Sequence, residues 1–102
     1  MKAYTLDEIR DIVSRLARQY GAKRVYLFGS YARGEMTEAS DIDLRIDKGE
    51  IRGFQLAGLL LDLEDSLGVP VDLVPTTSLD QHFLNSIQDE EVLLYDCLLY
   101  TS

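Results

Sequence analysis

Residues 41–47 constrain most narrowly what this chain can fold into. The stretch reads Asp-Ile-Asp-Leu-Arg-Ile-Asp, a strict alternation of charged and apolar side chains. Because successive side chains of a β-strand point to opposite faces, the alternation predicts a strand with one core face and one solvated face. Asp41 and Asp43 then lie on the same face as Arg45 and Asp47. The two leading carboxylates, about 7 Å apart, repel each other unless a cation lies near them.

A Gly-Ser pair lies a short distance upstream. The apolar run at 25–28 ends in Gly29-Ser30, and we expect one or two helical turns at 30–34. A strand that enters a helix through such a turn directs free backbone N–H groups and the positive end of the helix dipole to one spot, which favours an anion. Taken alone, a Gly-Ser pair is also a common turn, and an Asp-x-Asp pair is also common as solvated acids on an edge strand.

A third carboxylate, Asp72, interrupts the apolar run 69–74. Pro70 near the start of this run favours an edge strand or a strand beginning. If this strand runs beside residues 41–47, Asp72 lies on the same face as the two upstream aspartates, where a general base or a second-metal ligand is needed. An acid that simply faces solvent is the other interpretation.

Helical periodicity connects these strands. Thr5 and Glu8 form a capping-box pattern, and Gly21 stands where a helix cap is expected. The other predicted elements are helices over 6–20, 51–67 and 79–88, a polar loop over 34–39 and a fourth strand at 92–95, while the tail 97–102 has no clear pattern. This order predicts one α/β (α+β) domain over residues 1–102 with a small central sheet.

The helix over 51–67 has a wider apolar sector than one core contact requires. Phe54, Ala57 and Leu61 extend this sector beyond the main leucine stripe. Either the sector contacts another protein, or the small domain covers the helix on both sides.

Charge and composition exclude several classes of protein. The net charge is −8, and no basic stripe is present that would hold a nucleic acid along its backbone. The chain has no signal-peptide pattern, no apolar stretch of about 18 residues and a single cysteine, Cys97, so we expect a cytoplasmic protein without membrane contact. The lone His82 has no metal-binding companions, and the acidic run 89–91 is most simply a solvated turn.

These features together resemble the minimal nucleotidyltransferase family, the small members of the polymerase-β-like nucleotidyltransferase superfamily. The family pattern of Gly-Ser, ten residues and Asp-x-Asp is met by Gly29-Ser30 and Asp41-Ile42-Asp43, and its extended form by Ala32-Arg33-Gly34 and Ser40. The resemblance covers roughly residues 5–96. It implies a small mixed sheet that carries the site on one face, with helices packed against the other.

The resemblance also implies the metal chemistry. Asp41 and Asp43 would bind Mg²⁺, two ions in all, bridging the triphosphate of ATP. Asp72 would be the third carboxylate, which activates the acceptor hydroxyl or joins the second metal.

The same resemblance assigns the phosphate contacts. Gly29 and Ser30 would hold the β- and γ-phosphates, and Arg33 would either neutralise phosphate charge or form an ion pair with a nearby Asp. Arg45, on the carboxylate face, has the same two options.

The reaction implied is an in-line attack by an acceptor hydroxyl on the α-phosphorus, with pyrophosphate leaving. Within the family, the chain resembles the antitoxin of a toxin–antitoxin pair, which implies a HEPN-type RNase toxin as partner, a tyrosine of that toxin as AMP acceptor, and a homo- or hetero-oligomer. Two alternatives stay open: an antitoxin that neutralises its partner by contact alone, and transfer to a small-molecule hydroxyl.

Overall fold

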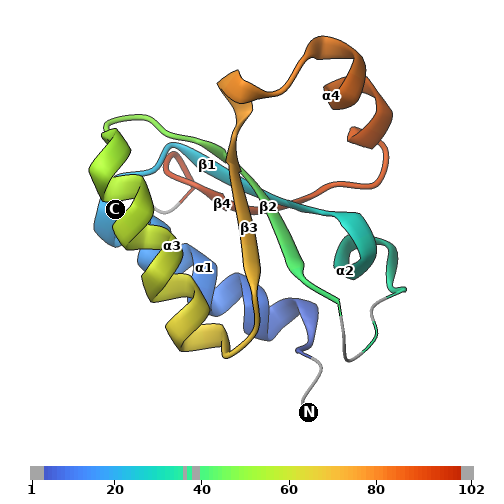
Figure 1. Ribbon diagram of the computed structural model, residues 1–102, viewed down its shortest axis with the longest axis horizontal. Helices are drawn as coiled ribbons and strands as arrows, with labels where there is room; N and C mark the ends of the chain where they lie inside the picture. The colour runs from blue at the N-terminus through green and yellow to red at the C-terminus, as the bar shows by residue number, and fades with distance from the viewer. Residues whose placement is uncertain (1–3, 36, 38–39, 100–102) are drawn as a thin grey trace.

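The computed structural model describes residues 4–35, 37 and 40–99. Its elements, in order, are α1 (Leu6–Tyr20), β1 (Arg24–Phe28), α2 (Gly29–Arg33), β2 (Ile42–Asp47), α3 (Gly53–Leu67), β3 (Val71–Pro75), a 3₁₀ turn η1 (Thr76–Ser78), α4 (Gln81–Ile87) and β4 (Val92–Asp96) (Figure 1). This order is the one that the sequence predicts, and the α/β fold class is confirmed.

The strands form one mixed sheet in the order β3-β2-β1-β4. Strand β1 is antiparallel to β2 and β4, whereas β2 is parallel to β3. The expectation that Pro70 marks an edge strand is confirmed, because β3 begins directly after it and lies at the edge of the sheet. In this register Asp43 is the lateral partner of Phe28 on one side and of Asp72 on the other.

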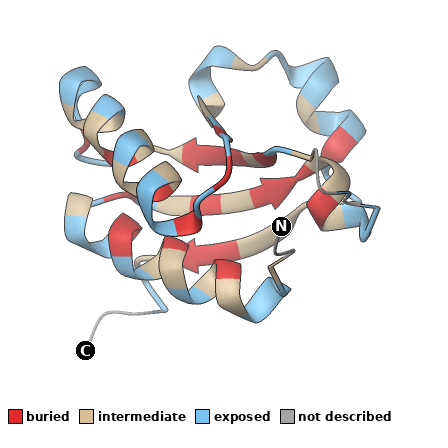
Figure 2. Ribbon diagram, turned by 60° about the horizontal axis from the view of Figure 1, so that its bottom comes forward, coloured by how far each residue is buried: buried red, intermediate tan, exposed pale blue. Residues whose placement is uncertain are grey.

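The apolar side of β2 faces the long helices. Ile42, Leu44 and Ile46 are fully buried, and with α1 and α3 they form the core, where Figure 2 shows buried residues on the strands and on the two long helices. The short α4 is attached to the opposite, polar face. Its Phe83 ring meets the Phe28 ring edge-on, with the ring centroids 5.9 Å apart.

Local hydrogen bonds fix the helix ends. The capping box is present: the Thr5 hydroxyl accepts from the Glu8 N–H at 3.1 Å, and the Glu8 carboxylate accepts from the Thr5 N–H at 2.9 Å. Helix α4 starts later than predicted because Asp80 is its N-cap and accepts from the Phe83 N–H at 2.7 Å. Helix α3 likewise begins at Gly53 rather than residue 51, because Arg52 is its N-cap and has an extended backbone.

The outer surface of α3 remains open to solvent. Phe54 is 77% exposed and Leu61 is 65% exposed, and Ala57 lies between them on the same side of the helix. The interpretation that the domain covers this helix on both sides is therefore wrong.

Two predictions fall partly outside the described residues. Residues 34, 35 and 37 of the predicted loop are non-helical, while 36 and 38–39 lie outside the described part. After β4, residues 97–99 form a turn, and 100–102 of the tail lie outside it too. Among the described residues, no helix is long and apolar enough to cross a membrane.

Candidate active site

The turn between β1 and α2 lies directly against β2. Gly29 has φ +75°, a left-handed conformation that favours glycine. A β-carbon at this position would overlap the Oδ2 atom of Asp43 and lie 3.1 Å from its Cγ. The structure therefore joins the two sequence motifs physically, and only a glycine leaves room for the Asp43 carboxylate beside the turn.

The predicted carboxylates converge at this end of the polar face. Asp43 and Asp72 are lateral partners across the parallel pair β2–β3, so their side chains share a face, and Asp41 lies just before β2. Burial raises the pKa of Asp43, and the negative charges of Asp72 and Asp41 raise that pKa further, whereas Arg33 lowers it. Such a cluster favours a bound cation.

None of these three carboxylates has a hydrogen bond or ion pair within the described residues. No three carboxylate, imidazole or thiol groups of that part of the chain stand close enough to form a metal-binding set by themselves. Mg²⁺ ordinarily takes only one or two carboxylates, with phosphate oxygens and water completing its coordination. The oxygen-only donor set at Asp41, Asp43 and Asp72 fits an ion that arrives with a nucleotide.

Ser30 and Arg33 lie three residues apart on α2, so they are neighbours on one helix face. The Ser30 hydroxyl makes no hydrogen bond within the described residues. The Arg33 guanidinium forms ion pairs with Glu35 at 2.7 Å and with Glu90 at 3.2 Å. The expected ion pair of Arg33 with an aspartate is therefore wrong among the described residues, because two glutamates, which the sequence pattern did not indicate, take the guanidinium.

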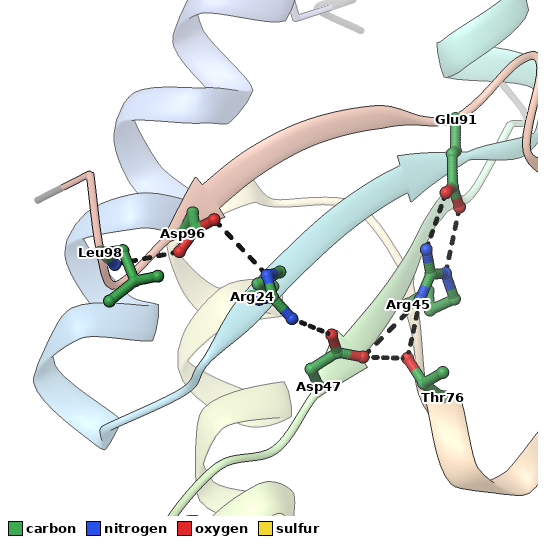
Figure 3. A network of polar contacts seen from close by, with 7 residues as sticks. All are labelled: Arg24, Arg45, Asp47, Thr76, Glu91, Asp96 and Leu98. Atoms are coloured by element: carbon green, nitrogen blue, oxygen red, sulfur yellow. Dashed lines mark hydrogen bonds and ion pairs between the residues drawn. The ribbon is translucent and has the colours of Figure 1, made fainter.

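Further along the same face, the charges are fully paired (Figure 3). Arg45 is 9% exposed, and its Nε and Nη2 atoms donate to the two carboxylate oxygens of Glu91 at 3.0 and 2.7 Å. The guanidinium also lies over the Tyr26 ring, 3.9 Å from its centroid. The prediction that the charged face of β2 is solvated is wrong at Arg45, because Glu91, from the α4–β4 connection, covers the Arg45 side chain.

The rest of this network lies at the far end of the face. Asp47 accepts from the Thr76 hydroxyl at 2.6 Å and from Arg24 at 3.3 Å, and Arg24 also donates to Asp96 at 3.4 Å. These residues belong to β1, β2, η1 and β4, so the network ties the sheet together across its polar face.

The acidic run 89–91 was predicted as a solvated turn, and this is wrong for two of its residues. Glu91 pairs with Arg45 and Glu90 pairs with Arg33, whereas Asp89 is exposed. The signal available in the sequence was that β2 carries an arginine on a face that needs a counter-charge. His82 is exposed.

Comparisons with known proteins identify the family of this chain. Residues 6–94 match the nucleotidyltransferase domain family. The chain belongs to that family. This nucleotidyltransferase is 36% identical over 97 residues to the protein adenylyltransferase MntA of Thermococcus cleftensis, an alignment that covers 90% of the chain and 98% of the relative. The prediction of an enzyme of this class is confirmed.

Solved structures share the fold. A minimal nucleotidyltransferase structure is 35% identical, covers 90% of this chain and 98% of its own, and has a TM-score of 0.78. The MNT antitoxin bound to a tri-AMPylated HEPN toxin of Shewanella oneidensis has a TM-score of 0.69. That alignment covers 92% of this nucleotidyltransferase and 75% of the other chain, and at 21% identity it shows the fold alone.

Proposed function

We propose that this nucleotidyltransferase transfers AMP from Mg²⁺-bound ATP to a protein hydroxyl, with Asp41, Asp43 and Asp72 at its reaction centre. The observation that carries the proposal is the contact of Gly29 with Asp43, whose lateral neighbour across β2–β3 is Asp72. The Gly29–Ser30 turn is thereby placed against carboxylates that have no hydrogen bond or ion pair among the described residues, an arrangement that suits a phosphate with its Mg²⁺ ion. The name of the Thermococcus cleftensis relative, a protein adenylyltransferase, supports AMP as the group transferred.

The position of each residue determines its proposed role in binding the metal ion or the phosphates. Bound Mg²⁺ supplies neutralisation of phosphate charge and of the attacking and leaving oxygens. Asp41 and Asp43 would hold the ion from the protein side, and Gly29 leaves the room that the Asp43 carboxylate occupies beside the turn. The Ser30 hydroxyl and the Arg33 guanidinium, on one face of α2, donate to the β- and γ-phosphates.

Asp72 stands toward the acceptor. It is exposed at the edge strand, whereas Asp43 is half-buried, so Asp72 is accessible to an incoming hydroxyl. In this position Asp72 takes the hydroxyl proton or joins the second metal ion. The acceptor oxygen then forms a bond to the α-phosphorus as the bond to pyrophosphate breaks, a reaction that depends on positioning and electrostatics.

The test uses two labels. The protein is incubated with Mg²⁺, the product of the neighbouring gene, and ATP labelled at either the α- or the γ-phosphate. We expect label on the acceptor from the α-position only, and on a tyrosine by peptide mass spectrometry. Absence of α-label would contradict the proposal, and label from the γ-position would indicate a kinase instead.

We further propose that the acceptor is a HEPN-type toxin and that this chain is its antitoxin. The motif resemblance supports this pairing, and the MNT antitoxin of Shewanella oneidensis, which has the same fold, is bound to a HEPN toxin. A variant with both Asp41→Asn and Asp43→Asn separates catalysis from contact. If that variant still neutralised the toxin fully, contact alone would be the antitoxin function.

The exposed stripe of α3 is the surface we propose for partner contact. Phe54 and Leu61 are separated by two helical turns and face solvent. Replacing both with Asp is expected to abolish co-elution with the HEPN protein while leaving nucleotide binding unchanged. Leu98→Asp is the matched control, because Leu98 is 74% exposed and lies in the turn after β4. Unchanged co-elution of the double variant would reject this surface.

A further inference from the structure

Arg33 is held from two sides by acids. Its Nε atom donates to Glu35 at 2.7 Å, and its Nη1 atom donates to Glu90 at 3.2 Å. Within the described residues, the Nη2 group has no hydrogen-bond partner. The two acids therefore fix the guanidinium plane and leave one amino group, with two N–H donors, for another acceptor.

The two acids differ in how firmly the fold holds them. Glu35 is close in sequence to Arg33, and its side chain is 65% exposed. Glu90 is 57 residues away, in the connection between α4 and β4, and its side chain is 29% exposed. The N–H groups of Glu90 and Glu91 both donate to the carbonyl of the buried Ile87, at 3.0 and 2.9 Å. Glu90 is thus the anchored partner.

The residue after Glu90 strengthens this anchor. Glu91 binds Arg45 through both carboxylate oxygens, which ties the α4–β4 connection to the middle of β2. Consecutive glutamates therefore reach two different arginines, one on α2 and one on β2. The Arg33 guanidinium is positioned by the sheet that carries the carboxylates, rather than by its own short helix alone.

Arg33 also lies within electrostatic range of the reaction centre. Its positive charge opposes the rise in the pKa of Asp43. It shares a face of α2 with Ser30, so a phosphate bound at the Gly29–Ser30 turn is within one helical turn of the guanidinium.

We propose that Glu90 is a positioning residue, which holds Arg33 so that its Nη2 group meets the terminal phosphate oxygens of the nucleotide. This inference rests on the proposed function, since it requires a nucleoside triphosphate at the Gly29–Ser30 turn. The Glu90 carboxylate does not touch the nucleotide and acts through Arg33. Its loss therefore weakens the binding of the triphosphate and leaves the metal carboxylates in place.

The test measures binding without an acceptor. Calorimetric titration with Mg²⁺ and a non-hydrolysable ATP analogue is expected to show about 3–10-fold weaker binding for Glu90→Ala than for the wild type. Glu90→Gln keeps an acceptor oxygen for Nη1 and is expected to restore most of the affinity. Asp89→Ala, at the exposed neighbouring acid, is the matched control and should bind within about twofold of the wild type. In transfer assays, the KM for ATP should rise for Glu90→Ala with little change in kcat.

A double variant separates positioning from a general structural role. In an Arg33→Ala background, Glu90→Ala should cause no further loss of affinity, because the residue through which Glu90 acts is gone. An equal loss in that background, tighter binding by Glu90→Ala, or unchanged binding would each overturn the inference. If the wild-type protein bound no nucleotide, the proposed function would be rejected as well. If the wild type bound the nucleotide and Glu90→Ala bound it equally well, only the inference about Glu90 would be rejected.

Discussion

The polar face of the sheet has two ends, which differ in whether their charged side chains are paired. At the end near the Gly29 turn, Asp41, Asp43 and Asp72 gather, and none of them has a hydrogen bond or ion pair to another described residue. At the other end, Arg45 and its neighbours are all joined in one network. Strand β2 runs through both ends, and Asp43 and Arg45 are only two residues apart on it.

This difference shows what each end is for. A buried charge that has a partner can hold segments of the chain together, whereas a cluster of like charges costs free energy unless something external neutralises it. The paired end ties β1, β2, η1 and β4 into one unit. The unpaired end is then the part of the molecule where we propose that a cation binds.

The largest expected effect comes from exchanging one aspartate at each end. Asp43→Asn should lower the initial rate of AMP transfer by at least about 10²-fold, because the ion loses its half-buried ligand, with no loss of stability. Asp47→Asn should leave the rate within about threefold but lower the free energy of unfolding by about 1 kcal/mol, because Asp47 accepts from Thr76 and Arg24. Label transfer and urea denaturation measure the two quantities.

The contrast between the two ends is wrong if Asp43→Asn and Asp47→Asn change the transfer rate and the free energy of unfolding in the same way. A stable, active Asp43→Asn protein would remove the reaction centre from this end of the face. An inactive but fully stable Asp47→Asn protein would place part of the chemistry at the paired end.

The next effect concerns stability at the paired end. Glu91→Ala should lower the free energy of unfolding by about 2–4 kcal/mol, because it leaves the guanidinium of Arg45 nearly buried without its bidentate partner. Replacing the pair together, with Arg45→Met and Glu91→Leu, should cost much less, since no unpaired charge remains. Asp89→Ala is the control for the same turn. Equal costs for the single and double variants in urea denaturation would show that packing, not charge, decides stability here.

Local sequence patterns predicted most of the fold. The alternation over residues 41–47 gave the buried Ile42, Leu44 and Ile46 side of β2, and the Thr5–Glu8 capping box gave the start of α1. These predictions succeed because the burial of one strand face and the capping of one helix end depend on residues close together in the chain. The turn at Gly29 follows the same logic, although its contact with Asp43 does not.

Strand pairing limited what could be predicted about the site. Asp72 was a conditional candidate, because alternation shows which face a residue occupies but not which strand lies beside it. The parallel register of β2 with β3 supplied that missing condition. The partners of Arg33 and Arg45 were out of reach for the same reason: Glu90 is 57 residues away from the first, and Glu91 is 46 residues away from the second.

The smallest expected effect is a pH dependence that differs between the two ends. The pKa of Asp43 is raised in the folded protein, chiefly by burial and then by Asp72 and Asp41. Between its unfolded and folded pKa values the native state therefore binds more protons than the unfolded state, so stability falls as pH rises through this window. Removing the carboxylate with Asp43→Asn should raise the Tm above the window and leave it unchanged below.

Activity should follow the opposite direction, because only the ionised Asp43 carboxylate holds a cation. At low concentrations of Mg²⁺ and ATP, the kcat/KM for transfer should rise with pH through the raised pKa that Asp43 has in the ligand-free protein, while the Tm without metal falls. Added Mg²⁺ and nucleotide should raise the Tm of the wild type through binding to the native state, and should raise that of Asp43→Asn much less. A variant of the paired end, Asp47→Asn, serves as control and should keep the wild-type response to ligand. If Asp43→Asn were less stable than the wild type above the window, the carboxylates at the Gly29 end would be structural, and the contrast between the two ends would disappear.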